Sequence, residues 1–239
     1  LNPFGMVEDL SRLCGEGDHI VPCSSGGAFT VMMQAFQLRS GQTMLTDKGL
    51  ASMGYGLSGA IGVAIADPKR RTVLVEGDGG FTQNLQELAT VAVNQLNLKI
   101  FLFCNEGYAS IRMTQKNYFE GAYVGCDVSS GLGFPDWPIL AAAYRIPCRQ
   151  LEEGWHSDPE FVELWNNTSP AIFLVPLHPE QTYFPKITSR ISASGGMESN
   201  PLHLMSPDLS PEMKQFVMRY FPAEDSSDAS KSKSVPSPS

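Results

Sequence analysis

The sequence lacks an apolar run of the roughly 18 or more residues that a membrane-spanning helix needs. It also lacks a basic stripe: 17 Lys and Arg stand against 25 Asp and Glu, a net charge of −8. This balance argues against nucleic acid as a partner, and the missing apolar run argues against a membrane. No Cys-x-x-Cys pair is present. An odd number of scattered cysteines is typical of a reduced cytoplasmic chain, and the five are Cys14, Cys23, Cys104, Cys126 and Cys148.

Hydrophobic residues make up 42% of the 239 residues, which is enough for a sizeable core. Apolar strands alternate with helical segments over residues 1–185, and this order predicts an α/β fold: a doubly wound parallel sheet flanked by helices. The periodicity fades after that point. Residues 186–222 are expected to form an irregular C-terminal arm with a short helix near 211–219. Residues 223–239 are rich in Ser, Lys and Pro and are expected to be disordered.

Hydrophobic periodicity and turn residues place the individual elements. A long loop rich in Gly, Ser and Asp, residues 118–136, follows the helix predicted at 107–117, and a loop of this length is commonly functional. Strands are predicted at 19–23, 42–45, 73–75, 100–103, 146–149 and 171–175, and helices at 4–14, 28–36, 54–66, 83–95, 107–117, 137–144 and 159–165.

Two polar motifs each follow an apolar strand. Gly77-Asp78-Gly79-Gly80 follows the first, and after the spacer of residues 80–104 comes Asn105-Glu106-Gly107. The helix predicted between them makes a βαβ unit, which brings the two strand ends side by side in a parallel sheet. Ligands of open α/β sheets bind at these carboxyl ends.

A carboxylate and an amide at this place suit Mg²⁺, which takes oxygen ligands in a near-octahedral shell shared with substrate phosphates. Asp78 would supply the charge, Asn105 an amide oxygen and Gly107 a main-chain carbonyl. Gly79 and Gly80 let backbone N–H groups approach phosphates. A helix that starts near Thr82 would point its positive end at them. An isolated Gly-Asp-Gly, in contrast, is usually an ordinary turn.

The small-residue turn at Ser24-Ser25-Gly26-Gly27 is a second candidate phosphate cradle. It follows a predicted strand and leads into a helix, so a plain strand-to-helix turn is the competing interpretation. Its position beside the first motif in the predicted sheet favours contact with a diphosphate.

These motifs resemble the thiamine diphosphate fingerprint: Gly77-Asp78-Gly79, the spacer and Asn105 match it in order. Residues 84–90 resemble a helix of acetolactate synthases and their relatives, and residues 51–62 resemble that family's Met-Gly-(Phe/Tyr)-Gly-Leu-Pro segment. The resemblance covers about residues 2–185, which would correspond to the last third or so of a typical member. It identifies residues 1–185 as a diphosphate-binding (PP) domain.

Four departures from the family pattern are visible. Ser58 stands where the family has Pro, and Cys104 replaces the first residue of its Asn-Asn pair. The family's Gln-His dipeptide is replaced around Gly27-Ala28, and residues 105–110 differ from Asn-Asn-x-x-x-Gly-Met. The departures bear on the substrate more than on the cofactor.

The resemblance implies thiamine diphosphate and Mg²⁺ as cofactors, with Met53 as the apolar wedge beneath the coenzyme rings. Its implied reaction is decarboxylation of a small 2-oxo acid followed by carbon–carbon bond formation. No catalytic residue is expected in this chain, because the activating Glu belongs to a pyrimidine-binding domain on another chain or upstream segment of a homo- or hetero-oligomer. The implied metal ligands are Asp78, Asn105 and Gly107; the implied cofactor-binding residues are Ser24, Ser25, Gly26, Gly27, Ser52, Met53, Gly77, Gly79, Gly80, Asn105, Gly107, Tyr108 and Ala109.

Other functions stay open from the sequence. A simple 2-oxo acid decarboxylase shares nearly the same fingerprint. A non-catalytic thiamine-fold partner or regulatory subunit fits the substitutions at Ala28 and Cys104 and the missing Glu. A nucleotide-binding module is disfavoured because Gly-Lys-Ser and Gly-Lys-Thr are absent.

Overall fold

The computed structural model describes residues 1–192, 195–201 and 203–220. The chain divides into two compact units, Leu1–Gln181 and a second that begins at Thr182. The tail that the sequence predicts to be disordered, 223–239, lies outside the described residues. Among these residues no helix is long and apolar enough to cross a membrane.

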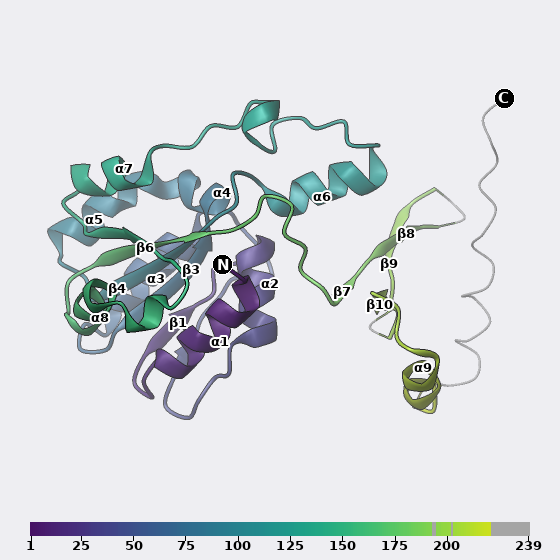
Figure 1. The fold of residues 1–239 in the computed structure, drawn as a ribbon, viewed down its shortest axis with the longest axis horizontal. Coiled ribbons are helices and arrows are strands. Elements are labelled where there is room, and N and C mark those ends of the chain that lie inside the picture. The colour runs from purple at the N-terminus through teal and green to yellow at the C-terminus, as the bar shows by residue number, and fades with distance from the viewer. Residues whose placement is uncertain (193–194, 202, 221–239) are drawn as a thin grey trace. The chain divides into compact units, whose positions relative to one another are not determined.

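The first unit is built on one six-stranded sheet whose strands all run parallel. The strand order, β2-β1-β3-β4-β6-β5, places the longest strand, β4, between β3 and β6 (Figure 1). The strands are β1 His19–Val21, β2 Thr43–Met44, β3 Thr72–Gly77, β4 Leu98–Cys104, β5 Cys148–Gln150 and β6 Ala171–Pro176.

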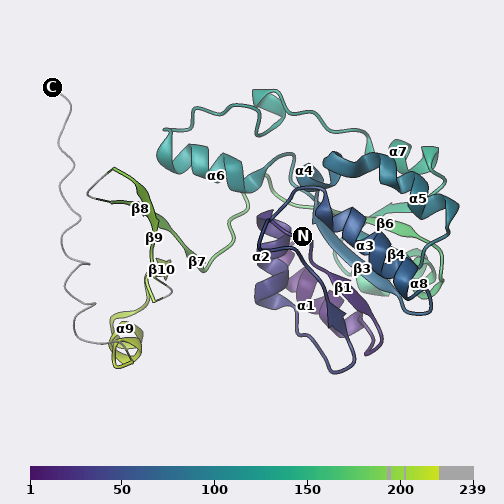
Figure 2. The same cartoon turned by 180° about the vertical axis from the view of Figure 1, so that it is seen from behind.

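Helices cover both faces of this sheet. The helices α3 (Tyr55–Ala66) and α5 (Leu88–Val93) lie in front of it in Figure 2, and α7 (Trp137–Ala143) joins their side of the core. In Figure 1 the opposite face is covered by α1 (Pro3–Leu13) and α8 (Pro159–Asn166), with α2 (Gly26–Ala35) packed beside α1. The predicted doubly wound parallel α/β fold is therefore confirmed.

Successive side chains of the central strand β4 point to opposite faces, as in any strand. Ile100 and Leu102 pack into the core beneath α3 and α5. Phe101, between them, stacks on the other side against Phe173 and Phe161, with ring centroids 5.0 and 6.4 Å away. Both faces are buried, and this explains why β4 reads as one continuous apolar run rather than as an alternating one.

The helix predicted at 83–95 is broken in the structure. A first turn, α4 (Asp78–Phe81), starts at Asp78 rather than near Thr82, and a 3₁₀ segment, η1 (Thr82–Glu87), separates it from α5. Asn84 leaves helical geometry with φ −138°. Its side-chain nitrogen donates to Gly54 O and to Ser58 Oγ, each at 2.9 Å, and these tertiary bonds outweigh helical propensity.

The remaining elements of the first unit follow β4 and β5. Helix α6 (Ala109–Tyr118) leads into the long loop, which contains the short 3₁₀ turn η2 (Val128–Ser130); η3 (Trp155–Ser157) precedes α8. The second unit has two small antiparallel pairs, β7 (Lys186–Ile187) with β10 (Met205–Ser206) and β8 (Ser189–Ile191) with β9 (Met197–Ser199), and the helix α9 (Pro211–Met218). These short strands had no signal in the sequence pattern, whereas the helix did.

Candidate functional site

The two polar motifs lie at adjacent strand ends. β3 and β4 pair in parallel register, with Gly77 opposite Phe103, so both chains leave the sheet at the same edge. Asp78 and Asn105 are the next residues to emerge. The structure therefore brings together the two side chains that the sequence placed 27 positions apart.

Backbone N–H groups hold the Asp78 carboxylate, which is only 2% exposed. Oδ1 accepts from Gly79 N at 2.7 Å, while Oδ2 accepts from Asn105 N at 2.9 Å and Glu106 N at 2.8 Å. Burial outweighs the effect of these donors, which lower the pKa of Asp78, and the pKa is raised to about 6. The carboxylate is thus fixed in direction, with Oδ2 bonded to the backbone of the Asn105 loop and Oδ1 beside the Asn105 side chain.

The Asn105 amide completes a compact polar group. One terminal atom of its side chain lies 3.2 Å from Asp78 Oδ1 and 2.8 Å from Gly107 O. With nitrogen at that position the amide donates to both acceptors. With oxygen there, three oxygens converge at separations near the roughly 3 Å edge of an octahedron of Mg–O bonds about 2.1 Å long. The residues present therefore fit a magnesium ion.

This donor set is chemically selective. One carboxylate, one amide and one carbonyl are hard oxygen ligands, which suit Mg²⁺ rather than the ions bound by thiolate or imidazole. Within the part of the chain that the structure describes, no group of three or more His, Cys, Asp or Glu is placed to hold a metal.

A cavity of about 200 Å³ opens beside this oxygen group. Its wall contains every residue implied by the resemblance except Ser24 and Ser52. Those two are joined by a hydrogen bond in which Ser24 Oγ donates to Ser52 O at 2.6 Å. The lining residues that the sequence predicted are Ser25, Gly26, Gly27, Met53, Gly77, Asp78, Gly79, Gly80, Asn105, Gly107, Tyr108 and Ala109; those it missed are Ala28, Glu76, Phe103, Ser110 and Ile111.

Two glycines of the site leave no room for a side chain. A Cβ on Gly79 would lie 2.4 Å from the Tyr108 ring, and one on Gly107 would lie 2.4 Å from Cys126 O. The ring of Tyr108 therefore packs directly on the backbone of the Asp78 turn. Only glycine fits at these two positions without a shift of the neighbouring atoms.

Glu76 is a cavity residue that was not predicted from the sequence. Its buried carboxylate forms part of the cavity wall, with Oε1 accepting from Gly77 N at 3.2 Å. Burial raises its pKa to about 7. A single acidic residue inside the apolar run of β3 was the available signal.

Met53 is 47% exposed and lines the cavity immediately before Gly54, whose φ of +87° starts α3. An apolar side chain left this open at a cavity is available to pack against a ligand.

The six residues from Gly54 to Gly59 also have Gly-x-Gly-x-x-Gly spacing, which in dinucleotide-binding proteins connects a strand directly to a helix. Here ten residues, 45–54, separate β2 from α3, so the spacing lacks that structural context.

Comparison with known proteins agrees with this geometry. The family described as "Thiamine pyrophosphate enzyme, C-terminal TPP binding domain" matches residues 25–174. The chain belongs to this family.

Individual relatives are acetolactate synthases. The chain is 28% identical over 187 residues to the acetolactate synthase isozyme 1 large subunit of Escherichia coli (strain K12), covering 78% of this chain and 33% of that protein. It is 33% identical over 177 residues to the mitochondrial acetolactate synthase catalytic subunit of Aspergillus candidus, covering 73% of this chain and 25% of that protein. The chain thus spans a third or less of the length of these relatives.

Proposed function

We propose that this chain is the thiamine diphosphate- and Mg²⁺-binding half of an enzyme that decarboxylates a 2-oxo acid and joins the product to a second carbonyl compound. One observation carries the proposal: Asp78 Oδ1, the Asn105 amide and Gly107 O meet at separations of 3.2 and 2.8 Å beside a cavity. Membership of the thiamine pyrophosphate enzyme family and the likeness to acetolactate synthases support it.

Each part of the cavity has a role in this proposal. Asp78, Asn105 and Gly107 hold the ion, and the turns at Gly80 and at residues 25–27 present backbone N–H groups to the diphosphate, while the Gly79 N–H is bonded to Asp78 Oδ1. Met53 packs beneath the coenzyme rings. When bound, thiamine diphosphate supplies the carbanion chemistry and the electron sink for decarboxylation, while the protein supplies binding and orientation.

The proposal includes a pyrimidine-binding domain, on another chain or in another segment of the same protein, that supplies the activating Glu. Glu76 and Glu87, which lie before and after the Gly77–Gly80 motif, already have other partners. Glu76 is buried against the backbone of its own turn, and Glu87 accepts a hydrogen bond from Thr90 Oγ1 at 2.9 Å. Exposed apolar side chains along the segments that line the cavity support a covering partner: Leu50, Met53, Ile111 and Phe119. We place this oligomeric assembly in the cytoplasm.

A ligand-protection experiment tests cofactor choice. Thiamine diphosphate with Mg²⁺ should raise the thermal unfolding midpoint of the complete native protein, because a ligand that binds only the folded state stabilises it. Neither ATP nor NAD with Mg²⁺ should do so. Equal protection by ATP would point instead to a general phosphate site and would contradict the proposal.

A second candidate, a non-catalytic thiamine-fold subunit, is favoured by one observation. Gly27 and Ala28, which replace the family's Gln-His dipeptide, line the cavity and bring no side-chain donor to it. Release of CO₂ from pyruvate and other 2-oxo acids separates the two. Turnover only in the presence of the pyrimidine-binding part supports the enzyme, and cofactor binding without turnover in the complete assembly supports the non-catalytic subunit. Robust turnover by this chain alone would refute the need for a partner.

A further inference from the structure

We propose that Arg112 is a positioning residue that fixes the loop carrying Asn105 and Gly107, with Asp127 as its charge partner. This inference rests on the proposed function, since it concerns the same magnesium site. Arg112 contacts neither the ion nor the diphosphate in this assignment. It acts through the backbone of the two ligands.

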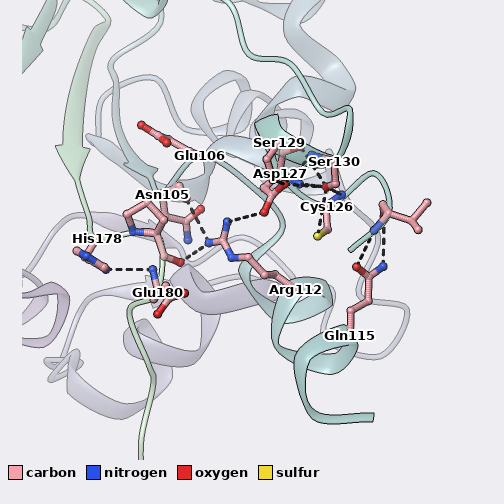
Figure 3. Close-up of polar contacts among 12 residues, drawn as sticks. Asn105, Glu106, Arg112, Gln115, Cys126, Asp127, Ser129, Ser130, His178 and Glu180 are labelled. Carbon is pink, nitrogen blue, oxygen red and sulfur yellow. Dashed lines mark hydrogen bonds and ion pairs between the residues drawn. The ribbon is translucent and has the colours of Figure 1, made fainter. Parts of the chain in front are cut away.

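The Arg112 guanidinium lies behind the loop rather than in the cavity. It projects from α6, and the residue is only 9% exposed. Nη2 donates to Asn105 O at 3.3 Å and also to Pro179 O, and Nη1 lies 3.9 Å from Asp127 Oδ2 (Figure 3). One side chain thus joins the strand-end loop after β4 to the segment after β6 and to the long loop.

The long loop, residues 118–136, also contacts the backbone of Gly107 and Tyr108. Tyr108 N donates to Cys126 O at 2.8 Å, and Gly107 forms an antiparallel bridge with Asp127. A Cβ on Gly107 would lie 3.0 Å from Arg112 Nη1. Gly107 is therefore enclosed between the guanidinium and residues 126–127, which restricts the direction in which its carbonyl can point.

Asp127 is itself held in place. Its Oδ1 accepts from Ser129 Oγ at 2.8 Å, from Ser130 N at 2.9 Å and from Ser130 Oγ at 2.7 Å, and Figure 3 shows these groups gathered on one side of Arg112. Oδ2 is left to face the guanidinium. The arrangement is a rigid support and not a mobile surface ion pair.

Two properties of the Arg112–Asp127 pair matter for the metal site: the balance of charge and the shape of the guanidinium. A buried guanidinium so near a cation site would repel Mg²⁺ unless a carboxylate balanced it, and Asp127 provides that balance. The planar fork of Arg also reaches two carbonyls and a carboxylate at once, which the single ammonium of Lys cannot do. Losing either property should weaken metal-dependent cofactor binding.

Arg112→Lys tests the shape of the guanidinium and Asp127→Asn tests the charge balance, with Arg71→Lys as the matched control. Arg71 is likewise a largely buried arginine paired with an aspartate, Asp18, and donating to a carbonyl, Trp165 O, but it lies beside the opposite ends of the strands. Binding of thiamine diphosphate with Mn²⁺ is measured by calorimetry on the complete native protein. The paramagnetic resonance spectrum of the bound Mn²⁺ and the unfolding midpoint without cofactor are recorded in parallel.

We expect Arg112→Lys and Asp127→Asn each to weaken Mn²⁺–thiamine diphosphate binding by about 10–100-fold, as supports of metal ligands do, and to broaden the Mn²⁺ spectrum. Arg71→Lys should lower the unfolding midpoint and leave affinity within about twofold of wild type. Wild-type affinity in both test variants would overturn the role of Arg112, and so would an equal loss in the Arg71 control. If Arg112→Lys does not fold, Asp127→Asn alone decides. A wild-type protein that binds no Mn²⁺–thiamine diphosphate overturns the proposed function first and this inference with it.

Discussion

A Cβ added to Gly56 would lie 1.9 Å from Oε2 of Glu76. Gly56 is in the first turn of α3, and Glu76 is the penultimate residue of β3, so the helix packs on the strand at the point where the carboxylate is buried. Because Gly56 has no side chain, the Glu76 carboxyl group can pack against α3 as part of the cavity wall. Gly56 therefore has a packing role in the fold.

Gly56→Ala should therefore destabilise the protein. Overpacking a tight site costs about 1–3 kcal/mol, which exceeds the gain of about 1 kcal/mol that Ala brings over Gly in a helix. Gly62→Ala in the same helix is the control, since nothing lies within 4 Å of its added Cβ, and it should stabilise. Urea unfolding without cofactor measures both. A Gly56→Ala variant as stable as Gly62→Ala would show that the Glu76 side chain moves aside freely.

Asp78→Asn should weaken Mg²⁺-dependent thiamine diphosphate binding by more than the roughly 10–100-fold typical of supporting residues, because it removes the only charge among the proposed ligands. Asn keeps the size of the side chain and one oxygen. Calorimetry with Mg²⁺ present measures the affinity. Asp136→Asn, at the N-cap of α7, is the control, since Asn and Asp cap helices about equally well. Unchanged affinity in Asp78→Asn would remove Asp78 from the metal site.

Met53→Ala should reduce coenzyme affinity by about 10–100-fold if the side chain becomes buried on binding, since burying a Met side chain is worth roughly 1.5–3 kcal/mol. Met53→Leu should keep most of the affinity. Because Met53 is half exposed without ligand, neither change should move the unfolding midpoint of the cofactor-free protein by much. A loss of affinity in Met53→Leu as large as in Met53→Ala would argue against a simple packing role.

Much of the fold and the centre of the site could be predicted from the sequence, because both depend on local patterns. The central strands β3, β4 and β6 contain apolar runs, and Asp78 and Asn105 directly follow two of them. Parallel pairing then places both at one edge without further information. The turn at 25–27 was found for the same reason, since small residues directly follow a strand.

What the sequence could not reveal depends on long-range contacts. Arg112 bonds to Pro179 O, 67 positions away, and the break at Asn84 comes from bonds to Gly54 and Ser58. No local pattern encodes such partners. Glu76 stands out in the sequence as an acidic residue in an apolar strand. The glycines that leave room for its carboxylate, Gly56 and Gly80, come from α3 and from the turn after β3.

Lys99 lies at the opposite end of β4 from the site and is 0% exposed, with Nζ donating to Asn167 Oδ1 at 3.0 Å and to Ser169 O. Burial, and then the nearby charge of Arg71, lower its pKa from 10.5 to about 8.

Between pH 8 and 10.5 the unfolded chain therefore binds more protons at Lys99 than the folded chain, so this residue should make the free energy of unfolding rise with pH across that window. Below pH 8 both states carry the charge and the cost of burying it is fully present. The difference in unfolding free energy between wild type and Lys99→Met should increase over the window by on the order of 3 kcal/mol, at about 1.4 kcal/mol per pKa unit. Subtracting the variant removes the titration of other lysines and tyrosines. Urea unfolding of wild type and Lys99→Met at intervals from pH 7 to 10.5 measures this difference, and a flat result would mean that the Lys99 ammonium stays hydrated in the folded protein.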